Sequence, residues 1–248
     1  MTTWITDKHL SQIANQPPTS SIRNQLKQWA KDHNQPIFVS YSLGKDAIAT
    51  ALALLEDEIP FIPVYLYLIP DLDFVTETIT TQQEKLGTRI RQYPHPSLYR
   101  WLNALTFQAP QNCEIIEQAN FITPTYSQMW ELIKEDHQAK PDTWVADGVR
   151  AADSIVRRAS LSRHGIMKPS NHKASPIADW RINAVRDIMH RHNFPLPIDY
   201  EWFGRSFDGI DARFMGPLKQ HCPADYQKVL QWFPLVELEA RRYEQQHA

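Results

Sequence analysis

Cysteine is scarce in this chain. Only Cys113 and Cys222 occur among 248 residues, and they form no C-x-x-C pair. This scarcity argues against a disulfide scaffold, a structural zinc site or an iron–sulfur cluster held by this chain alone. We therefore expect no iron–sulfur cluster among its cofactors.

Long apolar runs are also missing. No run approaches the roughly 20 residues that span a bilayer, and the start, MTTWITDKHL, lacks the basic and apolar segments of a signal peptide. We expect a cytoplasmic protein with no membrane association. The net charge of -2 gives no global sign of nucleic-acid binding, so any anion site must come from local clustering.

Glycine is rare too, with seven residues against eighteen prolines, so each glycine is expected to hold a special backbone position.

Strand-like and helix-like segments alternate from about residue 36 to 165. This alternation predicts an α/β fold with an open, mainly parallel twisted sheet, helices on both faces, and helical N- and C-terminal additions. The predicted strands are PIFVSY, FIPVYLYLI, TRIRQY and TWVADGV.

Four further predictions concern individual segments. Residues 4–33 are predicted as two helices, with Ser20 or Ser21 capping the second. Cys113 is placed in a loop, and the residues rich in Lys, His and Ser before 176 in another. We expect a helix over RAADSIVRRASLSR, beginning near residue 150.

The stretch IFVSYSLGKDAIAT, residues 37–50, places a Gly-Lys pair between a predicted strand and a predicted helix. Backbone N–H groups at such a helix start, at the carboxyl end of a parallel strand, favour an anion. Gly44 lets the backbone approach a phosphate, Lys45 adds positive charge and Ser42 a hydroxyl donor. The alternative is a glycine turn with a solvated Lys-Asp pair.

A Walker-type loop is excluded. That loop needs G-x-x-x-x-G-K-[ST], whereas Val39 stands where its first glycine belongs and Asp46 follows the lysine. Ser42-Leu43-Gly44-Lys45-Asp46-Ala47 instead resembles the S-G-G-K-D-S pyrophosphate loop of the adenine-nucleotide alpha-hydrolase superfamily. It departs from that loop at positions 43 and 47.

Two later stretches extend the resemblance. GVRAADSIVR, residues 148–157, is similar to the G-x-R-x-x-x-S-x-x-R segment of the phosphoadenosine-phosphosulfate (PAPS) reductase family. PIADW, residues 176–180, is similar to the P-[IL]-x-D-W that follows in that family, where Asp179 and Trp180 are expected to shape the pocket wall. The three matches cover residues 36–195 and suggest a divergent member.

The resemblance implies a nucleotide-binding α/β domain over residues 36–195. The sequence pattern outside it predicts an N-terminal helical segment (1–35) and a C-terminal helical and aromatic tail (196–248) packed on the same domain. The residues expected to bind nucleotide or phosphate are Ser40, Ser42, Leu43, Gly44, Lys45, Asp46, Gly148, Arg150, Ser154, Arg157 and Arg158.

A second cationic cluster lies between residues 150 and 173. Arg150, Ser154 and Arg157 are spaced four and three apart, so a helix from residue 150 would present them on one face. Paired guanidinium groups suit phosphate or sulfate oxygens. The alternative is a solvated helix face. The cluster comprises Arg150, Arg157, Arg158, Arg163, Lys168 and Lys173 with His164 and His172, against one acid, Asp153.

The reductase reaction is less well supported than the nucleotide site. Family members that make sulfite use a cysteine in a Glu-Cys-Gly-x-His motif near the C-terminus, and the end of this chain has none. Cys222, in KQHCPADY, is not an obvious replacement, and the family's D-T-G after the second strand is replaced by IPDLDF.

The favoured function is therefore cleavage of ATP or a related adenine nucleotide at its α-phosphate, by adenylyl transfer or hydrolysis, with pyrophosphate release. Lys45, Asp46, Arg150 and Arg157 are the catalytic candidates. The alternatives are a thiol-dependent reductase acting on PAPS or APS and a non-catalytic nucleotide-binding partner subunit. Magnesium is expected, held by Asp46, Asp71 or Asp73.

The second substrate is left open, as are a protein partner or homodimer and a nucleic acid. His95, in YPHPSLY, is a positional or a catalytic candidate. Aromatic residues of the tail would either dock a partner or pack over the sheet, and packing is favoured. They are Trp202, Phe203, Phe207, Phe214, Trp232 and Phe233.

Overall fold

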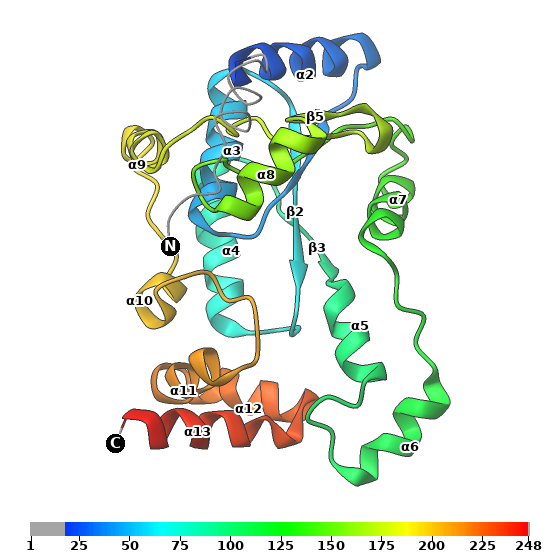
Figure 1. Cartoon of the computed structure of the whole chain (residues 1–248), viewed down its shortest axis with the longest axis vertical. Coiled ribbons are helices and arrows are strands. Elements are labelled where there is room, and N and C mark those ends of the chain that lie inside the picture. Colours follow the sequence, from blue (N-terminus) through cyan, green and yellow to red (C-terminus); the bar gives the residue numbers. More distant parts are fainter. Residues whose placement is uncertain (1–17, 248) are drawn as a thin grey trace, which may run out of the picture. The chain divides into compact units, whose positions relative to one another are not determined.

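A six-stranded sheet in the order β3-β2-β1-β4-β6-β5 organises the chain (Figure 1). The computed structural model describes residues 18–247, so the first of the two predicted N-terminal helices lies outside the described residues. The strands are β1 (Ile37–Ser40), β2 (Phe61–Tyr67), β3 (Arg91–Pro94), β4 (Val145–Ala146), β5 (Met167–Lys168) and β6 (Lys173–Ala174).

The sheet is mainly parallel, as the alternating pattern predicted. β1 pairs in parallel with both β2 and β4, and β4 pairs in parallel with β6. β5, at one edge, runs antiparallel to its neighbour β6. The first three residues of β1 are fully buried, which explains why the central strand is a continuous apolar run.

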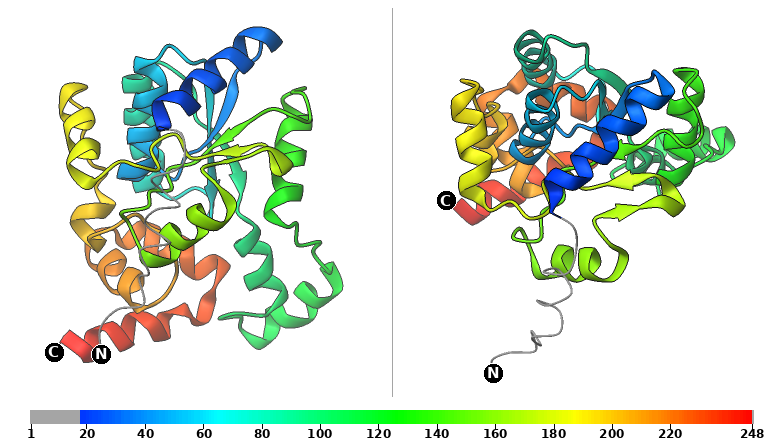
Figure 2. Two further views of the ribbon diagram at one scale, coloured as in Figure 1. Left: turned by 45° about the horizontal axis from the view of Figure 1, so that its top comes forward. Right: turned by 90° about the horizontal axis from the view of Figure 1, so that it is seen from above.

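Helices flank this sheet, which confirms the predicted fold class (Figures 1 and 2). In α3 every residue from Ala47 to Leu54 is buried, as its apolar character all round the helix required. The helices are α2 (Thr19–His33), α3 (Lys45–Glu56), α4 (Asp73–Leu86), α5 (Pro96–Asn103), α6 (Pro110–Ala119), α7 (Tyr126–Asp136), α8 (Ile155–His164), α9 (Ile182–Arg191), α10 (Asp199–Phe203), α11 (Ala212–His221), α12 (Pro223–Trp232) and α13 (Glu237–His247), with short 3-10 turns η1 (Pro169–Asn171) and η2 (Pro234–Val236).

Two predicted loops were wrong. Cys113 lies in helix α6, which starts with Pro110 and ends at Asn120 in the left-handed conformation. No residue of α6 is buried, so the sequence shows no apolar periodicity there. The loop before residue 176 contains strands β5 and β6, whose two residues each are too few for an alternating pattern.

Two predicted helix starts were also wrong. α8 begins at Ile155 rather than near residue 150, because Ser154 is its N-cap and accepts a hydrogen bond from the Arg157 N–H at 3.1 Å. α2 begins at Thr19, before the predicted caps. Its first N–H and the Thr19 hydroxyl donate to Asp179, at 3.3 and 2.6 Å.

The chain divides into two compact units. Unit 1 comprises Met1–Val64, Lys85–Arg91 and Lys134–Pro195, of which the structure describes the part from residue 18. Unit 2 comprises Tyr65–Glu84, Gln92–Ile133 and Leu196–Ala248, of which the last residue is outside the described part.

Unit 1 contains the point where the strand order reverses. From β1 the chain adds β2 and β3 on one side, whereas β4, β6 and β5 extend the sheet on the other. Open α/β sheets bind ligands at this topological switch point, beyond the carboxyl ends of the two strands. Here the loops that leave β1 and β4 meet at that edge, and both carry motifs singled out in the sequence.

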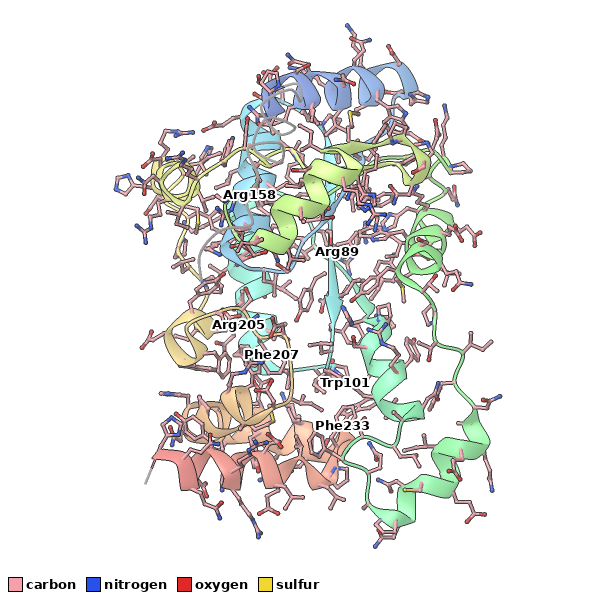
Figure 3. The ribbon with its side chains drawn as sticks, viewed as in Figure 1. Arg89, Trp101, Arg158, Arg205, Phe207 and Phe233 are labelled. Carbon is pink, nitrogen blue, oxygen red and sulfur yellow. The ribbon has the colours of Figure 1, made fainter. Side chains whose placement is uncertain are left out.

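Most of the tail aromatics named in the sequence pack inside unit 2, whereas Trp232 is 39% exposed. Phe207 and Phe214 are buried, with their ring centroids 5.4 Å apart in an edge contact, and both contact Phe203. Phe233 is fully buried and meets Trp101 at 5.9 Å (Figure 3).

Candidate anion site at the switch point

The loop after β1 contains a strained residue. Leu43 has φ 63°, the left-handed region that glycine adopts easily, and its side chain is only 4% exposed. Gly44 is extended, with φ -83°. The left-handed position of this loop is therefore 43, where the resembling pyrophosphate loop has glycine, the residue that adopts such a φ most easily.

Helix α3 starts directly after this loop. Gly44 is its N-cap and has no side chain to accept from the N–H groups of the first turn. These N–H groups and the positive end of the helix dipole favour a negatively charged ligand. Ser42, which precedes them, is exposed. The geometry is that of an anion site.

Lys45 and Asp46 are the first two residues of α3. The Lys45 Nζ lies 3.0 Å from the Asp46 Oδ2, and the side chains are 29% and 17% exposed. The Asp46 carbonyl accepts from the Thr50 hydroxyl at 2.8 Å, which fixes the first turn from within the helix. The Asp46 Oδ2 thus pairs with Lys45, and the Oδ1 can pair with a second cation.

The turn after β4 contacts this loop backbone to backbone. A Cβ on Gly148 would lie 2.9 Å from the carbonyl carbon and oxygen of Asp46 and 3.2 Å from the nitrogen of Ala47. No side chain fits in that space, so glycine is required here by close approach rather than by its φ. The two motif segments are in direct contact at Gly148.

Arg150 ties the same two segments together. Its Nε donates to the Asp46 Oδ1 at 2.8 Å, while its two Nη atoms reach the Trp180 carbonyl and Asp153, each at 3.4 Å. The side chain is 3% exposed. Removing one partner of such a buried pair leaves an uncompensated charge, so Arg150 is a structural link as well as a positive charge.

Arg157 and Arg158 continue from this link into α8. Arg157 pairs with Asp153, so Asp153 joins it to Arg150, and the Arg157 side chain remains 45% exposed. The Arg158 Nε donates to the Ala151 carbonyl at 3.3 Å (Figure 3). The predicted single helical face of Arg150, Ser154 and Arg157 is wrong, because Arg150 precedes the helix and Ser154 is its N-cap, but Asp153 connects the two arginines.

Asp147 was missed in the sequence. Its Oδ1 accepts from the Val149 N–H at 3.1 Å and from the Ser175 hydroxyl at 2.7 Å. Burial raises the pKa of Asp147. The two hydrogen bonds and the charges of Lys168 and Lys173 oppose this rise. The signal in the sequence was an acid placed between the apolar strand and Gly148. In the parallel register, the predicted site residue Ser40 lies one step beyond the pair of Val39 and Ala146, level with Asp147.

Asp71 and Asp73, proposed as magnesium ligands, lie in unit 2. Lys228 donates to the Asp71 carbonyl at 2.7 Å and to the Asp73 Oδ1 at 2.5 Å. Within residues 18–247 no group of three or more His, Cys, Asp or Glu side chains is arranged to hold a metal ion. Of the three proposed ligands, Asp46 belongs to unit 1, in the first turn of α3.

Cys222 is in unit 2, where its thiol donates to the buried Asp225 at 3.3 Å. Burial, this hydrogen bond and the charges of Asp225 and Asp73 raise the pKa of Cys222. Because the thiolate is the nucleophile in thiol chemistry, a raised pKa makes this cysteine less reactive.

His95 has a positional role in unit 2. It is the N-cap of α5, where its Nδ1 accepts from the Ser97 N–H at 3.0 Å, and its Nε2 lies 2.9 Å from the Tyr126 hydroxyl. Burial, and then the charge of Arg100, lower the pKa of His95. Trp180, in unit 1, lies beneath Arg23 at 5.8 Å.

These features define an α/β protein with a candidate anion site at a switch point. Two solved structures are similar over most of the chain. The NH3-dependent NAD synthetase from Campylobacter jejuni is 13% identical with a TM-score of 0.44, covering 91% of this chain and 93% of that one. The NMN synthetase from Francisella tularensis is 14% identical with a TM-score of 0.40, covering 90% and 96%.

No protein-family model and no curated protein sequence matches the chain. Among the described residues, no helix has the length and apolar character that a bilayer crossing requires.

Proposed function

We propose that this chain binds ATP, or a related adenine nucleotide, at the switch point and promotes attack on its α-phosphate with release of pyrophosphate. The observation that carries the proposal is the junction of the two motif segments. Arg150 bonds Asp46 across 104 residues of sequence, and Gly148 lies against the same turn. Both segments resemble parts of one nucleotide site, and here they are in contact.

The proposed roles follow from exposure and position. The first-turn N–H groups of α3, with Ser42 and Lys45, hold the β- and γ-phosphates. Arg157, half exposed, lies near the phosphates, while Arg150 acts from behind the loop by fixing Asp46. The remaining proposed contacts are Ser40, Leu43, Gly44, Gly148, Ser154 and Arg158.

The reaction requires one bond to form and one to break. An oxygen nucleophile attacks the α-phosphorus, the bond to the oxygen bridging the α- and β-phosphates breaks, and its electron pair leaves on pyrophosphate. The proton of the nucleophile passes to solvent. Lys45 and the positive end of α3 stabilise the charge that develops on pyrophosphate. Water as nucleophile gives hydrolysis, and an acceptor oxygen gives adenylyl transfer.

We expect magnesium at this site as a companion of the nucleotide. Mg²⁺ in nucleotide sites is commonly bound by phosphates with one or two carboxylates. Asp46 supplies one carboxylate, which already faces Lys45 and Arg150. The metal would neutralise phosphate charge.

Calorimetry with ATP and Mg²⁺ tests the binding. Lys45→Ala is expected to abolish measurable ATP binding. Lys31→Ala, an exposed lysine of α2 in the same unit, is the matched control and should bind like the wild type. Unchanged affinity in Lys45→Ala would exclude the proposed site.

A second assay separates the reactions. The protein is incubated with ATP, APS or PAPS, and pyrophosphate, AMP and sulfite are measured. Pyrophosphate from ATP supports the proposal. Thiol-dependent sulfite release that is lost in Cys222→Ser would instead assign the reductase, and binding without any product would assign a non-catalytic partner subunit.

A further inference from the structure

The β5–β6 hairpin of unit 1 carries two lysines that no carboxylate pairs with in the described part of the chain. Lys168 and Lys173 are directly opposite each other in the antiparallel register. Side chains at such positions lie on one face of the sheet, and like charges there repel. Both are half-buried, which limits screening by water. An anion between them would relieve this repulsion.

This lysine pair lies on the same sheet face as part of the candidate site. Lys173 is level with Val145 in β4, and alternate residues point to one face, so Lys173 and Ser175 share a face with Asp147. The 2.7 Å bond between Ser175 and Asp147 confirms this orientation. Among the described residues Asp147 forms no direct ion pair with either lysine, but the charges of both lysines lower its pKa, so its carboxylate offsets only part of their repulsion.

The charges of the chain are strongly segregated. The segments of unit 1 contain 19 Lys and Arg against 13 Asp and Glu, whereas those of unit 2 contain 7 against 15. The net charge of the chain is near zero, but unit 1, which contains the candidate site, has an excess of six positive charges. Such an excess favours a polyanion over a singly charged partner.

Helix α8 adds an exposed apolar pair to this cationic unit. Ile155 and Val156 are 69% and 78% exposed directly after Ser154, and Leu161 is the one buried residue of the helix. α8 accordingly lies on the outside of unit 1 (Figure 2). Near its end, Arg163 is exposed and has no carboxylate partner among the described residues. Ile155 and Val156 are aliphatic and cannot stack on a base as aromatic side chains do, but they offer an apolar surface that a base can cover.

We propose that the acceptor at this site is a single-stranded nucleic acid, with backbone phosphate held by Lys168 and Lys173 and bases resting on Ile155 and Val156. A free phosphate would use the lysine pair alone. A strand also uses the apolar pair, Arg163 and the positive excess of the unit. This inference rests on the proposed function, since it names the class of acceptor.

Fluorescence anisotropy with a labelled 20-nucleotide strand, as DNA and as RNA, measures binding between 50 and 300 mM salt. The expected result is affinity that falls steeply with salt. For a single strand, the plot of log K against log salt falls less steeply by about 0.7 for each phosphate contact that is lost. Lys168→Ala/Lys173→Ala should lower the slope by about 1.4 and weaken binding about tenfold or more at 50 mM salt.

The control is Lys27→Ala/Lys31→Ala, which removes two lysines of α2 from the same unit and should leave the affinity close to that of the wild type. Ile155→Ser/Val156→Ser should weaken binding with the slope unchanged, because no phosphate contact is lost. Circular dichroism and melting temperature check that each variant is folded.

Absence of strand binding at 50 mM salt would overturn the inference, as would equal affinity of the hairpin variant and the wild type. Inorganic phosphate displacing the strand at a concentration as low as the strand's own would also overturn it, and would assign the pair to a small anion. ATP affinity, measured by calorimetry on the same variants, should be unchanged. The proposed function is judged separately by Lys45→Ala.

Discussion

Leu43 shows how a departure from a motif can preserve the loop. Its φ of 63° is costly for leucine, on the order of 1 kcal/mol. Burial of its side chain stabilises the protein by roughly 2 kcal/mol, which exceeds that cost. The loop motif could therefore be recognised from residues 42–46, whereas its strain could not, because the sequence does not show what the side chain packs against.

Leu43→Ile and Leu43→Gly separate conformation from burial. Isoleucine keeps the volume but is β-branched and disfavours positive φ, so we expect loss of ATP binding and a stability loss of about 1–2 kcal/mol. Glycine accepts the conformation but loses the buried side chain, so we expect lower stability with ATP affinity within about threefold of the wild type. Calorimetry and urea unfolding measure both. ATP binding retained by Leu43→Ile would contradict the conformational role.

Gly148→Ala places a methyl group 2.9 Å from the Asp46 backbone, which cannot move without disturbing the start of α3. We expect a loss of about 1–3 kcal/mol in the free energy of unfolding and at least tenfold weaker ATP binding. Ala152→Ser, at an exposed position of the same turn, is the control. If Gly148→Ala binds ATP normally, the backbone contact is not part of the site.

At the scale of elements, the apolar patterns predicted the longer helices and the parallel strands. Elements with little burial or few residues were missed: α6 buries no side chain, and β5 and β6 have two residues each. The start of α8 was misplaced because Arg150 has the spacing of a helical residue but is drawn into the turn by Asp46. The start of α8 therefore depends on a contact between distant segments, which no local pattern shows.

Helices α11 and α13 of unit 2 provide an element-scale prediction. A Cβ on Gly216 would lie 2.1 Å from the ring of Tyr243, so the ring packs against bare backbone. Gly216→Ala should destabilise the protein by about 1–3 kcal/mol through overpacking.

The cost should disappear once the ring is removed. In a Tyr243→Ala background, Gly216→Ala should be neutral or stabilise by up to about 1 kcal/mol, because alanine is the better helix residue. Urea unfolding of the two single variants and the double variant gives the coupling. Additive effects would show that the ring does not pack on Gly216.

At the scale of the molecule, the sequence predicted a parallel sheet but not its strand order. The order depends on where β4 is inserted after the long connection from β3, and no local pattern encodes that choice. The segregation of charge was likewise hidden, because the segments of each unit alternate along the chain and the total is near zero.

Hydrogen exchange tests the switch point in the whole molecule. ATP should slow exchange in peptides covering residues 41–47 and 147–154 together, since both loops meet at one edge of the sheet. A nucleotide at one hundred times its Kd should also stabilise the fold by about 2.7 kcal/mol. Protection of the first segment without the second would contradict a shared site.

The junction of Asp46 with Arg150 has a consequence for folding. A chain emerging from the ribosome carries the first loop long before residue 150, so half of the site exists without its counterpart. Contacts of such sequence separation form slowly, because a long loop must close first. A nucleotide should therefore bind only after the centre of the sheet has assembled. Its binding should slow the unfolding of the folded protein and leave the folding rate unchanged.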